Sequence, residues 1–306
     1  MRWMEISVEA HGAADELCGT LEALGVGGMV VEDEREFLSF LEGNRQYWDF
    51  VDEELLARYK GLSRVKFYLS DDEAGWALLN TIRAALDLPL DVKSVADSDW
   101  ENNWREYYRP IEIGKKLLIV PEWLDAGDTK RLVLRLDPGL SFGTGEHAST
   151  QLCLAMLEEY VRPGARVLDL GCGSGILGIG AILLGARSVT GCDIDPLAPE
   201  AAMRNAALNG IGAGRFSAIR GDVIKDAALR TAMGGCYDLV LANIVADVII
   251  PLAGLVREFL SPDGIFICSG IIESRRSDVE RALRDAGLRT VARREKDEWN
   301  CFACVM

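Results

Sequence analysis

The chain has 306 residues, which is enough for two domains that each bury a hydrophobic core. Hydrophobic residues account for 49% and charged residues for 26%, a composition typical of folded globular proteins. The net charge of −15 argues against nucleic acid as a direct substrate, because an acidic surface repels phosphate backbones. The amino terminus lacks a signal-peptide pattern, and the longest apolar run, 176–186, is too short to cross a membrane. We therefore expect a cytoplasmic protein with no membrane partner.

The negative charge is concentrated in the first third of the chain. Residues 1–95 contain 19 acidic and 9 basic residues, so they carry −10 of the total −15. An acidic surface of this kind attracts basic partners. Solubility alone is the alternative explanation, and both explanations remain open at this point.

Hydrophobic periodicity in the first 95 residues predicts a small α+β domain. Strands are expected at 3–10, 29–32, 65–69 and 90–95, helices at 13–24 and 73–86, and an irregular charged segment at 34–60. This strand-helix-strand-strand-helix-strand order is that of a ferredoxin-like sandwich. We assign residues 1–95 to this N-terminal domain.

A connector, residues 96–110, follows the N-terminal domain. Trp100 and Trp104 have the i,i+4 spacing of one helix face, and Pro110 ends the segment. Two aromatic rings on one face of a linking helix favour packing between domains, and contact with a substrate is the alternative.

Residues 111–306 predict an α/β domain with a doubly wound sheet. Strands are expected at 116–120, 131–136, 166–170, 188–193, 216–220, 237–243 and 265–269, with a strand pair at the carboxyl terminus. Helices are expected at 149–160, 175–184, 196–209, 246–259 and 277–286. Such alternation predicts a parallel, Rossmann-like sheet whose ligands bind at the carboxyl ends of the strands.

A glycine-rich turn follows the strand at 166–170. Gly171, Gly173 and Gly175 allow the backbone to turn tightly and to approach a ligand closely. The segment 173–178 also matches the dinucleotide pattern G-x-G-x-x-G, so a nicotinamide-dependent dehydrogenase is one alternative.

Two acidic residues bear on the choice of cofactor. Asp193 ends the next strand, 22 residues after Gly171, where a carboxylate suits a ribose diol of either NAD or S-adenosylmethionine. Asp169 ends the strand just before the turn. A carboxylate there suits the ammonium group of S-adenosylmethionine and would repel a pyrophosphate, so Asp169 favours S-adenosylmethionine.

Several longer motifs occur together, and they are specific as a set. In chain order they are DSDWENNWREYY, DPGLSFGTGEHAST, VLDLGCGSGILGIGA, GCDIDPLA and LANIVADVI. This combination strongly resembles the PrmA family, the methyltransferases of large-subunit ribosomal protein L11. The resemblance is close from about residue 97 to the carboxyl terminus, and it is architectural before that point.

The resemblance implies a class I methyltransferase that uses S-adenosylmethionine and N-methylates lysine or amino groups of a basic ribosomal protein. It also assigns residues to the site. The cofactor-binding residues, together with Gly173 of the same turn, are Thr150, Gly171, Asp193, Asn243 and Asp222, the last toward the adenine amino group. Residues 1–95 then become the substrate-recognition domain and residues 111–306 the methyltransferase domain.

The expected chemistry needs a neutral amine aligned with an activated methyl group. A lysine amine has a pKa of ~10.4, so it must lose its proton before it reacts. Asn243 is the expected catalytic residue, because its amide oxygen and nearby carbonyls can hold the incoming nitrogen. His147, which lies with Phe142 on the loop before the helix at 149–160, is an alternative general base, although a structural role is favoured for it.

Two other functions share these residues. One is an amine methyltransferase for a different protein or for a small molecule, and the other is a non-catalytic module that binds the cofactor or the ribosome. A metal site is not expected, because Cys301 and Cys304 lie in a strand where residues three apart face opposite sides.

Overall fold

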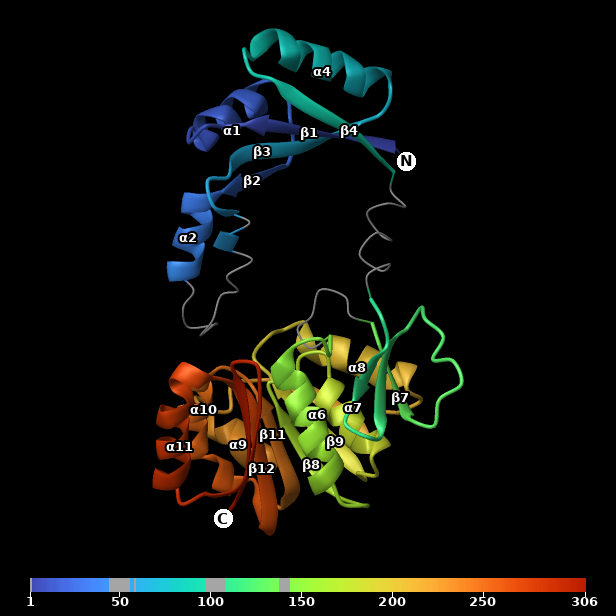
Figure 1. Cartoon of the computed structure of the whole chain (residues 1–306), viewed down its shortest axis with the longest axis vertical. Coiled ribbons are helices and arrows are strands. Elements are labelled where there is room, and N and C mark those ends of the chain that lie inside the picture. Colours follow the sequence, from blue (N-terminus) through green and yellow to red (C-terminus); the bar gives the residue numbers. More distant parts are fainter. Residues whose placement is uncertain (1, 44–55, 58, 97–107, 138–143) are drawn as a thin grey trace. The chain divides into compact units, whose positions relative to one another are not determined.

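The computed structural model of the chain describes residues 2–43, 56–57, 59–96, 108–137 and 144–306 (Figure 1). The chain divides into two compact units, Met1–Tyr108 and Arg109–Met306. The expected connecting helix with Trp100 and Trp104, and the loop residue Phe142, lie outside the described residues. Within the described ranges, no helix is both long and apolar enough to span a membrane.

The first unit is an antiparallel sheet with the strand order β2-β3-β1-β4. Its elements are β1 (Arg2–Glu9), α1 (Ala14–Ala23), β2 (Met29–Asp33), α2 (Glu34–Gly43), β3 (Ser63–Ser70), α4 (Glu73–Ala85) and β4 (Leu90–Ala96). Apart from α2, this is the element order expected for a ferredoxin-like sandwich. Alternate residues of β1 and β3 point into a core of their own with α1 and α4: Met4, Ile6, Val8, Leu21, Val65, Phe67, Leu79 and Ile82.

Helix α2 corrects the prediction that residues 34–60 are irregular from their start. Asp33 is buried, and its Oδ1 accepts hydrogen bonds from the amides of Arg35 and Glu36. A side-chain acceptor before the first turn satisfies amide groups that have no partner within the helix. Asp33 therefore begins a helix. The high charge of the segment had led to the prediction of an irregular structure.

The second unit contains the expected alternation of strands and helices. Its first three strands, β5 (Ile111–Ile113), β6 (Leu117–Pro121) and β7 (Leu132–Leu136), form a small separate sheet. The remaining elements are α6 (Ala148–Tyr160), β8 (Arg166–Leu170), α7 (Ile176–Leu183), β9 (Ser188–Asp193), α8 (Ala198–Leu208), β10 (Phe216–Arg220), α9 (Ala227–Met233), β11 (Tyr237–Asn243), α10 (Ala246–Ala253), β12 (Leu260–Ile272), α11 (Arg276–Asp285), β13 (Arg289–Lys296) and β14 (Trp299–Val305).

Two helices of this unit differ from the prediction. The short helix α9 was not expected; Asp226 begins it by accepting a hydrogen bond from the Leu229 amide. The helix predicted for 246–259 ends at Ala253, and a 3-10 turn, Val256–Glu258, follows it.

The main sheet has the strand order β10-β9-β8-β11-β12-β14-β13. Strands β8 to β12 pair in parallel, whereas β14 is antiparallel to both of its neighbours. The chain moves outward from β8 to β10 and then returns to place β11 on the other side of β8. The order therefore reverses between β8 and β11, and such a switch point opens a crevice at the carboxyl ends of these strands.

Helices cover both faces of the main sheet (Figure 1). Val167 of β8 and Leu241 of β11 pack with α6, α7 and α8, whereas their neighbours Leu168 and Val240 pack with α10 and α11. Successive residues of a strand face opposite sides of the sheet, so each buried strand contributes side chains to two hydrophobic cores.

Candidate functional site

The site lies at the switch point, where β8 and β11 end side by side. Ala242 pairs with Leu170 in the parallel register, so Asn243 and Gly171 are the next residues of the two strands. Gly171 has a φ of +74°, and a Cβ on it would lie 2.4 Å from Cγ2 of Ile244. The positive φ and this close contact both require glycine at position 171, where β8 ends beside β11.

The rest of the glycine turn is held against β9 and α8. Gly175 precedes α7 with a φ of +80°, and a Cβ there would lie 2.9 Å from the Cβ of Ala202. The Gly173 amide donates to Oδ2 of Asp193 at 2.8 Å. The predicted cofactor residues Gly171, Gly173 and Asp193 are thus brought together by the fold.

Asp193 ends β9 with both carboxylate oxygens in use. Its Oδ2 accepts from Gly173, and its Oδ1 accepts from the Asp195 amide at 3.0 Å. An ionised carboxylate has about four acceptor positions. Asp193 therefore fixes the glycine turn and still has acceptor capacity for a diol at the same edge.

Asp169 does not face the ligand edge as the sequence analysis expected. Its side chain is fully buried, and Oδ2 accepts a 3.0 Å hydrogen bond from the Gly178 amide in the first turn of α7. Strand alternation explains the difference, because Asp169 shares a face with Val167, and α7 covers that face. Gly175 is the N-cap residue of α7 and has no side chain to accept a hydrogen bond from the first turn. The carboxyl group of Asp169 supplies such an acceptor instead.

The environment of Asp169 favours its protonated form. Burial raises the pKa of its carboxyl group to about 7, the Gly178 hydrogen bond opposes this, and the charge of Asp193 adds to it. Oδ1 has no hydrogen-bond partner among the described residues. Asp169 therefore offers no charged carboxylate to the ammonium group of a ligand, and it does not distinguish S-adenosylmethionine from NAD.

An Asp169→Asn variant is expected to lose much of the pH dependence of stability between about pH 4 and pH 7. The folded-state pKa lies above the ordinary 3.8, so this group stabilises the protein at low pH and its contribution is lost as pH rises through about 7. The full difference corresponds to on the order of 4 kcal/mol, and about 3 kcal/mol of it falls above pH 5. Urea unfolding of both proteins at pH 5 and pH 8 measures this part. Equal changes in the free energy of unfolding would show that the carboxyl group ionises normally.

Asn243 and Thr150 form the second half of the site. Nδ2 of Asn243 donates to Oγ1 of Thr150 at 3.1 Å, across 93 residues of sequence. Thr150 is buried in the first turn of α6, and its own amide donates to the carbonyl of His147. Oδ1 of Asn243 is buried, and no described residue donates to it. The amide is thus oriented through its nitrogen and keeps a free acceptor.

His147 has a structural role at the start of α6. Nδ1 lies 2.6 Å from Oγ of Ser149 and accepts from the Ser149 amide, which makes His147 the N-cap of the helix. Its ring packs edge-on against Trp299, and burial lowers its pKa below the ordinary 6.5. Since Nδ1 already serves the helix, these contacts favour the structural interpretation over a general base.

Asp222 lies just past the end of β10. Its Oδ1 accepts from the amides of Ile224 and Lys225, and its Oδ2 lies 3.4 Å from Nζ of Lys225. Burial opposes ionisation, but these amides and the ammonium group outweigh it and lower the pKa of the carboxyl group. Asp222 thus shapes the turn, and its contact with adenine stays a prediction.

Two aliphatic residues that were not predicted to belong to the site follow Asp193 in the turn after β9. Ile194 is 59% exposed and Leu197 is 70% exposed, although both are large and apolar. The signal was present in the motif GCDIDPLA, where apolar residues follow the acid at the end of a strand. They offer an exposed apolar surface in the turn that follows Asp193.

These residues fit S-adenosylmethionine. A turn that only glycine can make, a carboxylate with free acceptor capacity and exposed apolar side chains suit the amino-acid, ribose and adenine parts of the molecule. Within the described residues, no group of three His, Cys, Asp or Glu side chains is placed to hold a metal ion. The fold and the site together define a class I S-adenosylmethionine-dependent methyltransferase.

Comparison with known proteins specifies the family. The family model for ribosomal protein L11 methyltransferase (PrmA) matches residues 2–306. A ribosomal protein L11 methyltransferase from Pelotomaculum thermopropionicum is 38% identical over 99% of this chain and 98% of its own. Its counterpart from Caldicellulosiruptor saccharolyticus is 36% identical over 98% of both chains.

A solved structure agrees with these relatives. The crystal structure of the ribosomal protein L11 methylase from Lactobacillus delbrueckii subsp. bulgaricus has a TM-score of 0.58 and 36% identity. The match covers 64% of this chain and 98% of that one. The chain therefore belongs to the ribosomal protein L11 methyltransferase (PrmA) family and uses S-adenosylmethionine, and the dehydrogenase alternative is set aside.

Proposed function

We propose that this protein N-methylates lysine or other amino groups of ribosomal protein L11 in the cytoplasm. Family membership supports the protein substrate. The observation that supports an amine as the acceptor is the buried Oδ1 of Asn243, which has no donor among the described residues and lies at the switch point. An amine carries N–H donors that satisfy such an acceptor.

When bound, S-adenosylmethionine supplies a methyl group already activated by its sulfonium charge. In our proposal Gly171 and Gly173 provide the close backbone approach, Asp193 accepts from the ribose diol, and Ile194 covers the adenine. Thr150 and Asn243 close the site on the β11 side. In our proposal the two sets of residues lie on either side of the bound cofactor.

Asn243 orients the amine of the substrate. A protonated lysine has no lone pair, so its proton must pass to water before the amine reacts. Oδ1 of Asn243 then accepts a hydrogen bond from the neutral amine, and this contact directs the nitrogen lone pair toward the methyl group. Thr150 acts through Asn243, because its hydroxyl holds Nδ2 and thereby fixes where Oδ1 points.

We further propose that residues 1–95 recognise the substrate and that residues 111–306 carry out the reaction, with 96–110 as the linker. The acidic N-terminal unit suits a basic ribosomal protein.

The proposed function is tested by mixing the protein with labelled S-adenosylmethionine and purified ribosomal proteins. Label should appear in L11 and should be found on amine nitrogen after digestion. Label on another protein, on a small molecule or on no acceptor would support one of the alternative functions.

The role of Asp193 is tested by cofactor affinity. Asp193→Ala should weaken S-adenosylmethionine binding by roughly a hundredfold, because charge-assisted hydrogen bonds are lost. Asp193→Asn keeps an acceptor for the glycine turn and should lose less. In the unmodified protein, S-adenosylmethionine at ~100 times its Kd should add about 2.7 kcal/mol of stability, and NAD should add none. Unchanged affinity in the alanine variant would remove Asp193 from the site.

A further inference from the structure

A group of arginines lies at the edge of the sheet opposite to the methyltransferase site. Three loops lead into β8, β9 and β10; with the first residues of β8 and β9 they span 161–166, 184–188 and 209–215. Together they contain four arginines and no aspartate or glutamate: Arg162, Arg166, Arg187 and Arg215. The chain as a whole carries −15, so this local excess of positive charge differs from its surroundings.

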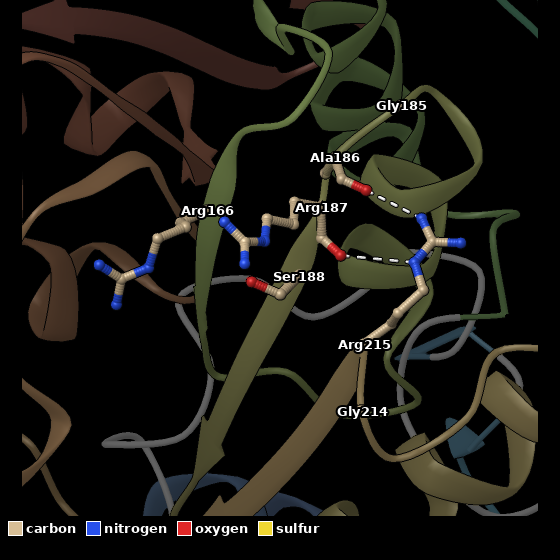
Figure 2. Close-up of a pocket in the computed structure, with 7 residues that line it drawn as sticks. All are labelled: Arg166, Gly185, Ala186, Arg187, Ser188, Gly214 and Arg215. Atoms are coloured by element: carbon tan, nitrogen blue, oxygen red, sulfur yellow. Dashed lines mark hydrogen bonds between the residues drawn. The ribbon is translucent and has the colours of Figure 1, made fainter.

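The loops surround a cavity of about 680 Å³ that is open to solvent. It is lined by Arg166, Gly185, Ala186, Arg187, Ser188, Gly214 and Arg215 (Figure 2). Its walls are tied together by hydrogen bonds. The Arg187 amide donates to the Ala165 carbonyl at 2.8 Å, and Gly164 donates to Gly185 at 2.9 Å. The arginines are therefore carried by loops in fixed positions relative to one another.

Two of the guanidinium groups are held by the fold. Arg215 donates to the carbonyls of Ala186 and Arg187, and Arg166 lies over the Tyr237 ring at 5.0 Å. The Arg187 side chain is exposed and has no hydrogen bond or ion pair with any described residue. Asp238 is a nearby acid, and its Oδ2 accepts from the backbone amide of Arg166. The single negative charge of Asp238 does not neutralise the three arginines that line the cavity, so the group keeps a net positive charge.

The guanidinium groups do not converge on one point. Figure 2 shows those of Arg166 and Arg187 on one side of the first residues of β9 and that of Arg215 on the other side. A guanidinium fork matches a phosphate group with two parallel hydrogen bonds. Arg187 offers a whole fork, whereas Arg215 and Arg166 each spend part of theirs on backbone carbonyls and contribute mainly positive charge. Positive groups spread in this way suit the successive phosphates of a nucleic-acid strand better than a single small anion.

We propose that these arginines bind the phosphate backbone of RNA. The choice of RNA rests on the proposed function, because a ribosomal protein is met in an RNA-rich assembly. The near-neutral methyltransferase unit permits the contact, since residues 109–306 hold 25 acidic and 23 basic residues. A five-residue strand is about 17 Å long, so RNA bound here stays away from the methyl-transfer edge and acts as a docking partner and not as a substrate.

The test is the affinity of the full chain for a labelled single-stranded RNA of about twelve nucleotides, measured by fluorescence anisotropy at several salt concentrations. We expect Arg187→Glu to weaken binding about tenfold and to reduce the slope of log affinity against log salt by about one. Arg281→Glu is the matched control, because that side chain is 63% exposed on α11, away from the three loops. Arg281→Glu should leave RNA affinity nearly unchanged.

Three results would overturn the proposal. They are no RNA binding by the unmodified protein at low salt, equal loss in the Arg187 and Arg281 variants, or binding of inorganic phosphate without binding of RNA. Methyl transfer to isolated L11 should be unchanged in Arg187→Glu. Failure of that transfer in the unmodified protein speaks against the proposed function and leaves the RNA measurement valid on its own.

Discussion

Replacing Asn243 with alanine is expected to lower turnover by about 10²–10³-fold, whereas affinity for S-adenosylmethionine should fall by less than about tenfold. The reason is that Oδ1 is the free, buried acceptor of the site, and its contact with the amine matters most when the nitrogen attacks. The measurement is single-turnover methyl transfer to L11 beside calorimetric binding of the cofactor. Equal losses in both quantities would return Asn243 to a purely structural role.

Thr150 provides a matched pair of variants for the same hypothesis. Thr150→Val keeps the shape of this buried side chain but removes the oxygen that accepts from Asn243 Nδ2, so the amide loses its fixed orientation. Turnover should then fall about fivefold, since one neutral hydrogen bond is worth roughly 1 kcal/mol. Thr150→Ser keeps the hydroxyl and should recover most of the activity. Equal activity in the valine and serine variants would contradict the positioning role.

Four strands of the main sheet were predictable because each is a short run containing apolar and β-branched or aromatic residues between turn signals. Strands β8, β9, β10 and β11 have the expected bounds, and the glycine turn follows β8 as expected. The edge at which Gly171, Asp193 and Asn243 meet follows from parallel pairing alone. The strand order that makes β8 and β11 neighbours comes from long-range pairing, which no local pattern contains.

The predicted orientation of Asp169 was wrong, because it depends on which face of β8 is covered by α7. The contact between Thr150 and Asn243 was not predicted, because these residues are 93 positions apart in the sequence and meet only after the sheet has formed. Helix α2 is different, because its signal was local. Asp33 followed by Glu36 has the spacing of a helix start, and Phe37 and Leu41 have helical spacing within a charged segment.

The N-terminal unit has an acidic surface that fits the proposed division of labour. Three carboxylates act together on the Cys18 thiol, whose pKa is raised by burial and by the charges of Asp15, Glu22 and Glu36. All three acids are exposed, and α1 contains no basic residue. A basic substrate can approach Asp15 and Glu22 without displacing a basic partner on α1, and Glu36 of α2 adds its charge to theirs.

A shortened chain that begins at Asp97 is expected to bind S-adenosylmethionine normally, because the methyltransferase unit keeps its own hydrophobic cores and its site. The same chain is expected to methylate L11 at least about tenfold more slowly, because it lacks the acidic N-terminal unit. In the full chain, the rate should fall steeply between 0.1 M and 1 M salt, as the Debye length shortens from about 10 Å to about 3 Å. A triple variant, Asp15→Asn, Glu22→Gln and Glu36→Gln, should reproduce part of the loss at low salt. Its matched control neutralises three exposed acids of the other unit, Asp128, Asp263 and Asp285, and should not. Should the shortened chain methylate L11 as fast as the full chain, the N-terminal unit is not the recognition element, and its acidity contributes only to solubility.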